Sequence, residues 1–151
     1  MKNALTIDSS VFLSAFLGKE PQSEISIDFL SFVRNNNFRI LMPILVVFEV
    51  LQGYYRSTKN LKETESIFEQ FIDLNISHKL KILNLEASFL ADFVAGHHFF
   101  DIKTSDTIVA ISAMTSNTPL ISWDKNLLKH SSSKLKTFTP QEFLQLAHQS
   151  S

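Results

Sequence analysis

The stretch ALTIDSSVFLSAF, residues 4–16, sets a pattern that recurs along the chain. Residues 4–7 form a short apolar run, which is typical of a strand buried on both faces. The run stops at Asp8, and Ser9 and Ser10 can cap a helix that continues through apolar positions to Phe16. The stretch therefore predicts a strand, an acidic residue at its end, and a helix, in that order.

The same alternation continues outward from this stretch. We predict further strands at 38–43, 78–85 and 119–122, and a short one at the start of KTFTPQEFLQL, residues 136–146. Helices are expected at about 22–34, 44–56, 61–72, 89–94 and 106–115, and after Thr139, where Pro140 and Glu142 complete a capping pattern. Strands that alternate with helices imply a parallel sheet covered on both faces. The predicted fold is an α/β three-layer sandwich with a central parallel sheet of four to five strands.

Length and composition set broader bounds. A chain of 151 residues with 44% hydrophobic and 19% charged residues fits one globular domain, residues 1–151. The absence of cysteine rules out disulfides and thiolate metal sites, and it is compatible with a cytoplasmic protein. We expect no signal peptide and no membrane span, because the apolar runs are short and interrupted. The net charge of −1 leaves any nucleic-acid binding to a local patch.

Four carboxylates are expected at one rim of the predicted sheet. Asp8 and Asp124 follow strands, and the second lies in TPLISWDKNL, residues 118–127; Asp106 begins a helix. Glu49 lies about two turns into an apolar helix. Ligands of open parallel sheets bind beyond the carboxyl ends of the strands. Singly, the first three acids are explained as helix caps or a turn residue. Together they would repel one another unless a cation binds, and oxygen ligands without cysteine favour Mg²⁺ or Mn²⁺.

Four segments then show a resemblance to a known family. LTIDSSVFLSAF (5–16), PILVVFEVLQG (43–53), TSDTIVAISAM (104–114) and LISWDKNL (120–127) resemble, in order, the signature segments of the PIN-domain family. KTFTPQEFL (136–144) also resembles its closing strand and helix. The chain is similar in size to the VapC-type toxin ribonucleases of that family.

The resemblance implies a fold, a site and an activity. It places the acidic quartet of the family on Asp8, Glu49, Asp106 and Asp124, as ligands of Mg²⁺ or Mn²⁺ and as catalytic residues. It implies hydrolysis of RNA phosphodiester bonds that leaves a 5′-phosphate and a 3′-hydroxyl. It also implies a small antitoxin as partner and a homodimer.

Several polar residues are candidates for contacts with RNA. Lys103, Lys125 and Lys129 are the cations nearest the acids in sequence, and Arg56 and Lys59 follow the helix of Glu49. Ser9, Ser105 and Ser122 can bond a carboxylate or a phosphate, although capping is the better explanation for the first two.

Other residues near the acids have two explanations each. Trp123 can stack on a base or pack over the sheet edge. Asp101 is a spare acid near the quartet, and His97 and His98 are interpreted as surface residues.

Alternative functions remain open at this point. A phosphoacceptor receiver domain also binds Mg²⁺ at strand ends, but it needs a second acid beside Asp8, and it needs an aspartate where KILNL offers only Asn84. A non-toxin RNA-processing nuclease and a catalytically silent partner-binding module share the predicted fold. An intact quartet argues against the silent module, because clustered carboxylates cost stability without a cation.

Overall fold

The structure is a computed structural model that describes residues 3–149. Its centre is a five-stranded sheet in the order β3-β2-β1-β4-β5, and every neighbouring pair is parallel. The strands are β1 (Ala4–Ile7), β2 (Arg39–Pro43), β3 (Leu80–Leu83), β4 (Leu120–Ile121) and β5 (Thr137–Phe138). The predicted α/β fold with a parallel sheet is confirmed, and the sheet has the larger of the two expected strand numbers.

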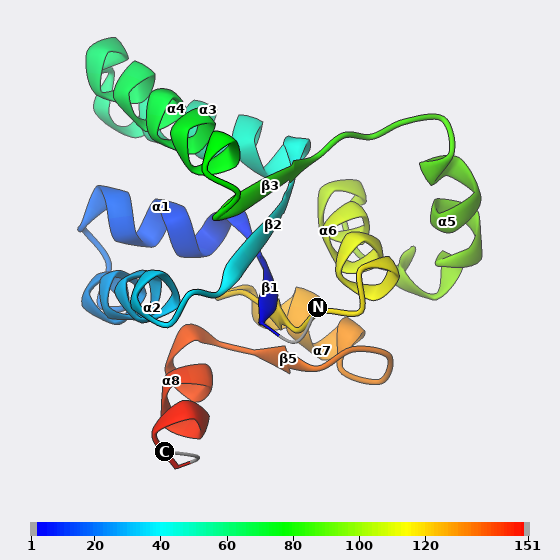
Figure 1. The fold of residues 1–151 in the computed structure, drawn as a ribbon. Helices are drawn as coiled ribbons and strands as arrows, with labels where there is room; N and C mark the ends of the chain where they lie inside the picture. The colour runs from blue at the N-terminus through cyan, green and yellow to red at the C-terminus, as the bar shows by residue number, and fades with distance from the viewer. Residues whose placement is uncertain (1–2, 150–151) are drawn as a thin grey trace.

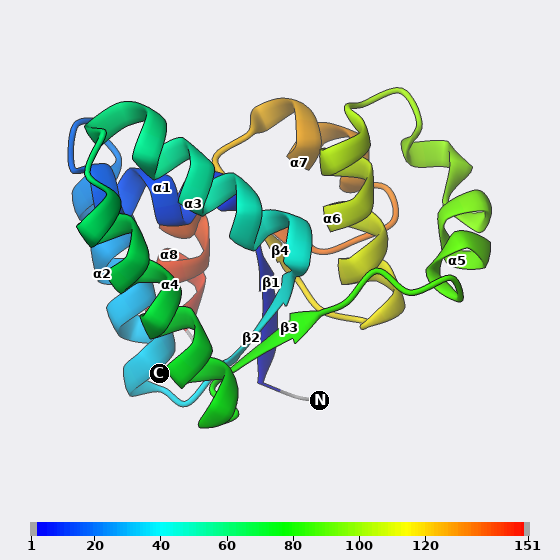
Figure 2. The same ribbon diagram turned by 90° about the horizontal axis from the view of Figure 1, so that it is seen from above.

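Helices cover both faces of the sheet (Figures 1 and 2). On one side lie α1, α2, α3, α4 and α8; on the other side lie α6 and α7, with α5 packed outside α6. Their bounds are α1 (Ser9–Leu17), α2 (Ser23–Asn35), α3 (Ile44–Thr58), α4 (Leu61–Ile76), α5 (Phe89–Ala95), α6 (Thr104–Thr115), α7 (Lys125–Ser131) and α8 (Pro140–Gln149). The three layers of the predicted sandwich are therefore present.

The central strands are apolar because helices cover them on both faces. All four residues of β1 and both residues of β4 are buried. Aromatic rings fill the space under the helices: Phe29 of α2 meets Phe143 of α8 edge to face, with ring centroids 5.6 Å apart. Gly53 allows α3 to lie close to α1, because a Cβ there would be 2.9 Å from Cδ1 of Leu13. Helices α1 and α3 therefore pack directly on each other.

The structure differs from the predicted elements in a few places. Helix α6 begins at Thr104, two residues before the predicted start, and β4 has two residues instead of four. Helix α7 was not predicted, because Asp124, which caps it, was interpreted as a turn residue after the strand. The capping pattern at Thr139 is confirmed: its backbone N–H donates to Oε2 of Glu142, which in turn donates its own N–H to Oγ1 of Thr139.

The described helices include no candidate membrane span. None of them, within residues 3–149, is both long and apolar enough to cross a bilayer.

Candidate metal centre

The sheet register brings the ends of β1 and β4 to the same level. Ile7 pairs with Ile121, and the backbone N–H of Asp8 donates to the carbonyl of Ile121 at 2.9 Å. Asp8 follows β1 directly, and Asp124 follows β4 after two residues. Both carboxylates therefore lie at the carboxyl edge of adjacent parallel strands, as predicted.

The other two acids reach this edge from helices. Asp106 is in the first turn of α6, which packs on β1 and β2. Glu49 is in the second turn of α3, which follows β2 on the other side of β1. All four elements start or end at one rim, so the fold brings together the four acids that the sequence singled out.

The pKa of Asp106 is affected by the other three acids. Its pKa is raised from 3.8 to about 6, first by burial and then by the negative charges of Asp8 and Asp124, with a smaller contribution from Glu49. Lys103, the residue that precedes α6, acts in the opposite direction. A bound cation would offset the repulsion between the charges of these four carboxylates.

Two serine hydroxyls hold one oxygen of Asp8. Oδ2 accepts hydrogen bonds from the hydroxyl of Ser10 at 2.6 Å and from the hydroxyl of Ser122 at 2.8 Å. The backbone N–H of Ser10 donates to the same oxygen at 3.3 Å. Asp8 is therefore the N-cap of α1, one of the two explanations that the sequence left open for this acid. Of the two serines that follow it, Ser10, and not the predicted Ser9, has the hydroxyl that reaches the acid.

Asp124 is held in a similar way. Its Oδ1 accepts from the backbone N–H groups of Asn126 and Leu127 at 2.8 and 3.0 Å, which makes it the N-cap of α7. Among the bonds of residues 3–149, the second oxygen of Asp8 and of Asp124 is not engaged. Each acid thus combines a structural cap with one oxygen available to a ligand.

The donor set fits a hard divalent cation. All four side chains offer carboxylate oxygens, which Mg²⁺ and Mn²⁺ prefer. Within residues 3–149, no three His, Cys, Asp or Glu side chains lie close enough together to form a coordination shell. Asp8, Asp106, Asp124 and Glu49 are the residues that would hold the ion.

The residues predicted to contact RNA belong to several elements around this rim. Lys103 precedes α6, and its charge lowers the pKa of Asp106, while Lys125 begins α7 directly after Asp124; both lysines are exposed. Ser9 is the first residue of α1, and the hydroxyl of Ser105 lies 3.5 Å from Oδ1 of Asp106. The remaining cations are exposed and farther along their helices: Lys129 in the last turn of α7, and Arg56 and Lys59 at the end of α3.

Trp123 packs against the protein core instead of lying free at the rim. Its ring is partly buried against the hydrophobic core, and its indole N–H donates to the hydroxyl of Ser26 in α2 at 2.8 Å. Of the two explanations for this residue, packing over the sheet edge matches the structure.

In the loop before α6, one of the two histidines interpreted as surface residues is partly buried. His97 and Asp101 are exposed, but His98 is half-buried, and its Nε2 is enclosed without a hydrogen-bond partner in the described part of the chain. Burial, followed by the charges of Lys134 and His97, lowers the pKa of His98. The interpretation of both histidines as surface residues is therefore wrong for His98, whose ring stacks near Phe99.

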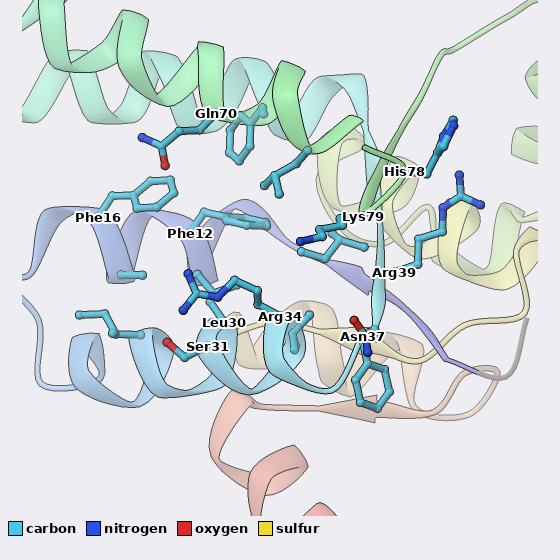
Figure 3. Close-up of a pocket in the computed structure, with 17 residues that line it drawn as sticks. Phe12, Phe16, Leu30, Ser31, Arg34, Asn37, Arg39, Gln70, His78 and Lys79 are labelled. Atoms are coloured by element: carbon cyan, nitrogen blue, oxygen red, sulfur yellow. The ribbon is translucent and has the colours of Figure 1, made fainter. Parts of the chain in front are cut away.

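A groove lies at the opposite ends of the strands from the acids. It has a volume of about 400 Å³ and runs between α2 and α4 over α1, with a largely apolar floor that includes Phe12, Phe16 and Phe71 (Figure 3). Arg34, Arg39, His78 and Lys79 line it, and none of the described lining residues is acidic. The groove is therefore separate from the acidic rim and has the opposite charge.

Comparisons with known proteins agree with this fold. Residues 5–132 match the family model described as PIN domain. No curated protein has a matching sequence.

Solved structures share the fold at low sequence identity. A chain in the structure of VapBC2 from Rickettsia felis bound to a promoter DNA fragment has a TM-score of 0.67 and 15% identity, over 90% of this chain and 98% of that one. FitAcB from Neisseria gonorrhoeae gives 0.64 and 14%, over 91% and 98%. A toxin–antitoxin complex from Klebsiella pneumoniae gives 0.64 and 15%, over 90% and 97%. Because the family model matches most of this chain, residues 5–132, and the acids lie at the expected rim, the chain belongs to the PIN domain family.

Proposed function

We propose that the protein is a metal-dependent endoribonuclease, and that it acts as the toxin of a type II toxin–antitoxin pair. The observation that carries the nuclease proposal is the position of four carboxylates at one rim of the sheet, where burial and then the charges of the other three acids raise the pKa of Asp106. Acids kept close together at a cost in stability are best explained by a cation that binds there. Similarity to chains from toxin–antitoxin structures supports the toxin role.

The residues have distinct tasks in this proposal. Asp8, Asp106 and Asp124 hold the cation, and Glu49 holds it through water or orients the attacking water. When bound, Mg²⁺ or Mn²⁺ lowers the pKa of water and offsets charge on the phosphate oxygens. Lys103 and Lys125 contact the RNA backbone, and Ser9 lines the path of the strand. The predicted RNA contact of Ser122 is wrong, because its side chain is fully buried and its hydroxyl donates to Asp8. The whole chain, residues 1–151, forms one nuclease domain.

The metal proposal is tested by thermal unfolding with and without Mn²⁺. Ligands that bind the folded state alone raise the melting temperature. Wild type should be stabilised by Mn²⁺, and Asp8→Asn should not respond, although Asn remains a good helix cap. If neither protein responds to Mn²⁺, the metal site is refuted. Nuclease activity is measured separately on a labelled RNA, which wild type should cut and Asp8→Asn should leave intact.

We also propose that the groove between α2 and α4 receives the antitoxin partner. An apolar floor lined by positive side chains fits an amphipathic segment that carries acidic residues, and Arg34 and Lys79 reach into the space between the helices (Figure 3). A protein encoded by the neighbouring gene should copurify with wild type and far less with Arg34→Glu/Lys79→Glu. The matched control, Lys19→Glu/Lys62→Glu, changes the same charge outside the groove and should retain the partner.

The other candidates make different predictions. A non-toxin RNA-processing nuclease would cut RNA but would have no small protein encoded beside it. A catalytically silent module would bind a partner without cutting RNA at any Mn²⁺ concentration.

A further inference from the structure

The hydroxyl of Ser10 joins three segments of the chain at the acidic rim. Ser10 is the second residue of α1, and its hydroxyl donates to Oδ2 of Asp8 at 2.6 Å. The backbone N–H of Trp123, in the turn after β4, donates to the same hydroxyl at 3.0 Å. One side chain therefore connects the end of β1, the start of α1 and the turn that carries Asp124.

Ser122 repeats this arrangement one residue earlier in the turn. Its hydroxyl donates to Oδ2 of Asp8 at 2.8 Å and accepts the backbone N–H of Asp124 at 2.9 Å. A serine hydroxyl has one proton to donate. Because both protons point to Asp8, the 3.2 Å contact between the two hydroxyl oxygens adds no further bond. Two consecutive backbone N–H groups are thus relayed through two hydroxyls to a single carboxylate oxygen.

Trp123 attaches the same turn to a second helix. Its indole N–H donates at 2.8 Å to the hydroxyl of Ser26, which is fully buried in α2. The side chain of Trp123 therefore anchors on α2, while its backbone bonds to α1 through Ser10. The turn before Asp124 is held at both of these points.

We propose that Ser10 and Trp123 are positioning residues that fix Asp8 and Asp124 relative to each other before the cation binds. The two serine hydroxyls occupy Oδ2 of Asp8, which leaves Oδ1 for the ion, and the Ser26 anchor prevents the Asp124 turn from moving away. This inference rests on the proposed metal-dependent function. Residues that support metal ligands in this way typically change metal affinity by about 10- to 100-fold.

The test measures Mn²⁺ affinity by calorimetry on the full chain. Ser10→Ala should weaken Mn²⁺ binding by about 10- to 100-fold, and Ser10→Thr, which keeps the hydroxyl, should restore most of it. Trp123→Phe and Ser26→Ala each remove one end of the same bond, so they should weaken binding to a similar extent. The matched control is Ser14→Ala, a buried serine one turn further along α1 whose hydroxyl has no partner among the described residues; its affinity should equal that of wild type.

A second measurement separates this inference from the proposed function. Hydrogen exchange of the Trp123 backbone and indole N–H groups is followed by NMR in protein free of metal. Exchange of the backbone N–H should be faster in Ser10→Ala, and that of the indole N–H faster in Ser26→Ala, than in wild type and Ser14→Ala.

Each outcome decides the question. Unchanged Mn²⁺ affinity in Ser10→Ala and Trp123→Phe overturns the positioning role while the metal site stands. If wild type binds no Mn²⁺, the proposed function fails, and the exchange rates alone decide whether the bonds of Trp123 to Ser10 and Ser26 hold the turn. Equal exchange rates in all variants refute these two bonds.

Discussion

At the scale of single residues, the raised pKa of Asp106 predicts a pH-dependent stability. Its folded value of about 6 lies above the ordinary 3.8, so the folded state binds the proton more tightly than the unfolded state. The stabilisation that protonation of Asp106 provides is complete below about pH 4 and is lost as the pH rises through about 6. A shift of this size corresponds to about 3 kcal/mol, which solvent screening of a half-buried group reduces to about 1 kcal/mol.

Chemical denaturation in EDTA between pH 4.5 and 8 measures this loss. Asp106→Asn has no carboxyl group to titrate and should show a flatter profile, with higher stability than wild type at pH 8. With Mn²⁺ present, the affinity of wild type should rise with pH up to about 6.5, because the ion displaces the proton of Asp106. Parallel profiles for wild type and Asp106→Asn would contradict the assignment.

The two roles of Asp124 can be separated by two substitutions. Asp124→Ala removes the cap of α7 and should cost about 1 kcal/mol of stability, and it should also abolish the response to Mn²⁺. Asp124→Asn keeps a capping side chain, so it should fold with nearly wild-type stability and still lose the Mn²⁺ response. Urea unfolding and melting with Mn²⁺ measure the two effects. An Asn variant that is still stabilised by Mn²⁺ would remove Asp124 from the metal site.

The sequence was sufficient to place the acids but not their supporting bonds. Asp8 and Asp124 follow apolar strands, and parallel strands end at one rim, so their meeting follows from the pattern. In α1, the hydroxyl that reaches Asp8 belongs to Ser10, not Ser9, because the direction of a side chain in the first turn depends on which residue caps the helix. The Trp123–Ser26 bond joins residues 97 positions apart, and no local pattern predicts it.

At the scale of elements, the sequence predicted all five strands and every α-helix except α7. Helices α3 and α4 have enough turns for an apolar face to be recognised, and the capping pattern at Thr139 marks the start of α8. Helix α7 has seven residues and exists because Asp124 caps it and Leu127 is buried. Such an element depends on tertiary packing more than on its own sequence.

The cap of α8 provides a control that is remote from the proposed chemistry. Thr139→Ala removes the hydroxyl that accepts the N–H of Glu142 and should lower the free energy of unfolding by about 1 kcal/mol. Mn²⁺ affinity and RNA cleavage should be unchanged, because β5 and α8 carry none of the four acids. Urea denaturation measures the first effect and calorimetry the second. A loss of Mn²⁺ binding in this variant would show that small stability losses alone disturb the site.

At the scale of the whole molecule, three surfaces are spatially separate. The acids lie at the carboxyl ends of the strands, and the cationic groove lies at the opposite ends between α2 and α4. Helix α5 lies on the far flank from that groove (Figures 1 and 2). A partner in the groove therefore leaves α5 accessible to a second copy of the chain.

We predict that the homodimer implied by the resemblance forms through α5. Leu90 and Val94 lie one turn apart on the helix, with 66% and 67% of their surfaces exposed, and Phe100 beyond its end is 48% exposed. Apolar side chains grouped in this way indicate a protein contact. In a symmetric dimer, Leu90→Glu/Val94→Glu would place like charges across the interface at a cost of several kcal/mol. Wild type should sediment as a dimer at micromolar concentration, and this variant as a monomer.

Leu61→Glu/Ile76→Glu is the matched control, because it adds the same charge at exposed apolar positions of α4. This control should remain a dimer, and both variants should bind Mn²⁺ as wild type does, since neither helix carries an acid of the quartet. A monomeric wild type would refute the dimer. Dissociation by the α4 substitutions, with a stable dimer in the α5 variant, would place the contact on the groove side, where it would compete with the partner proposed for that groove.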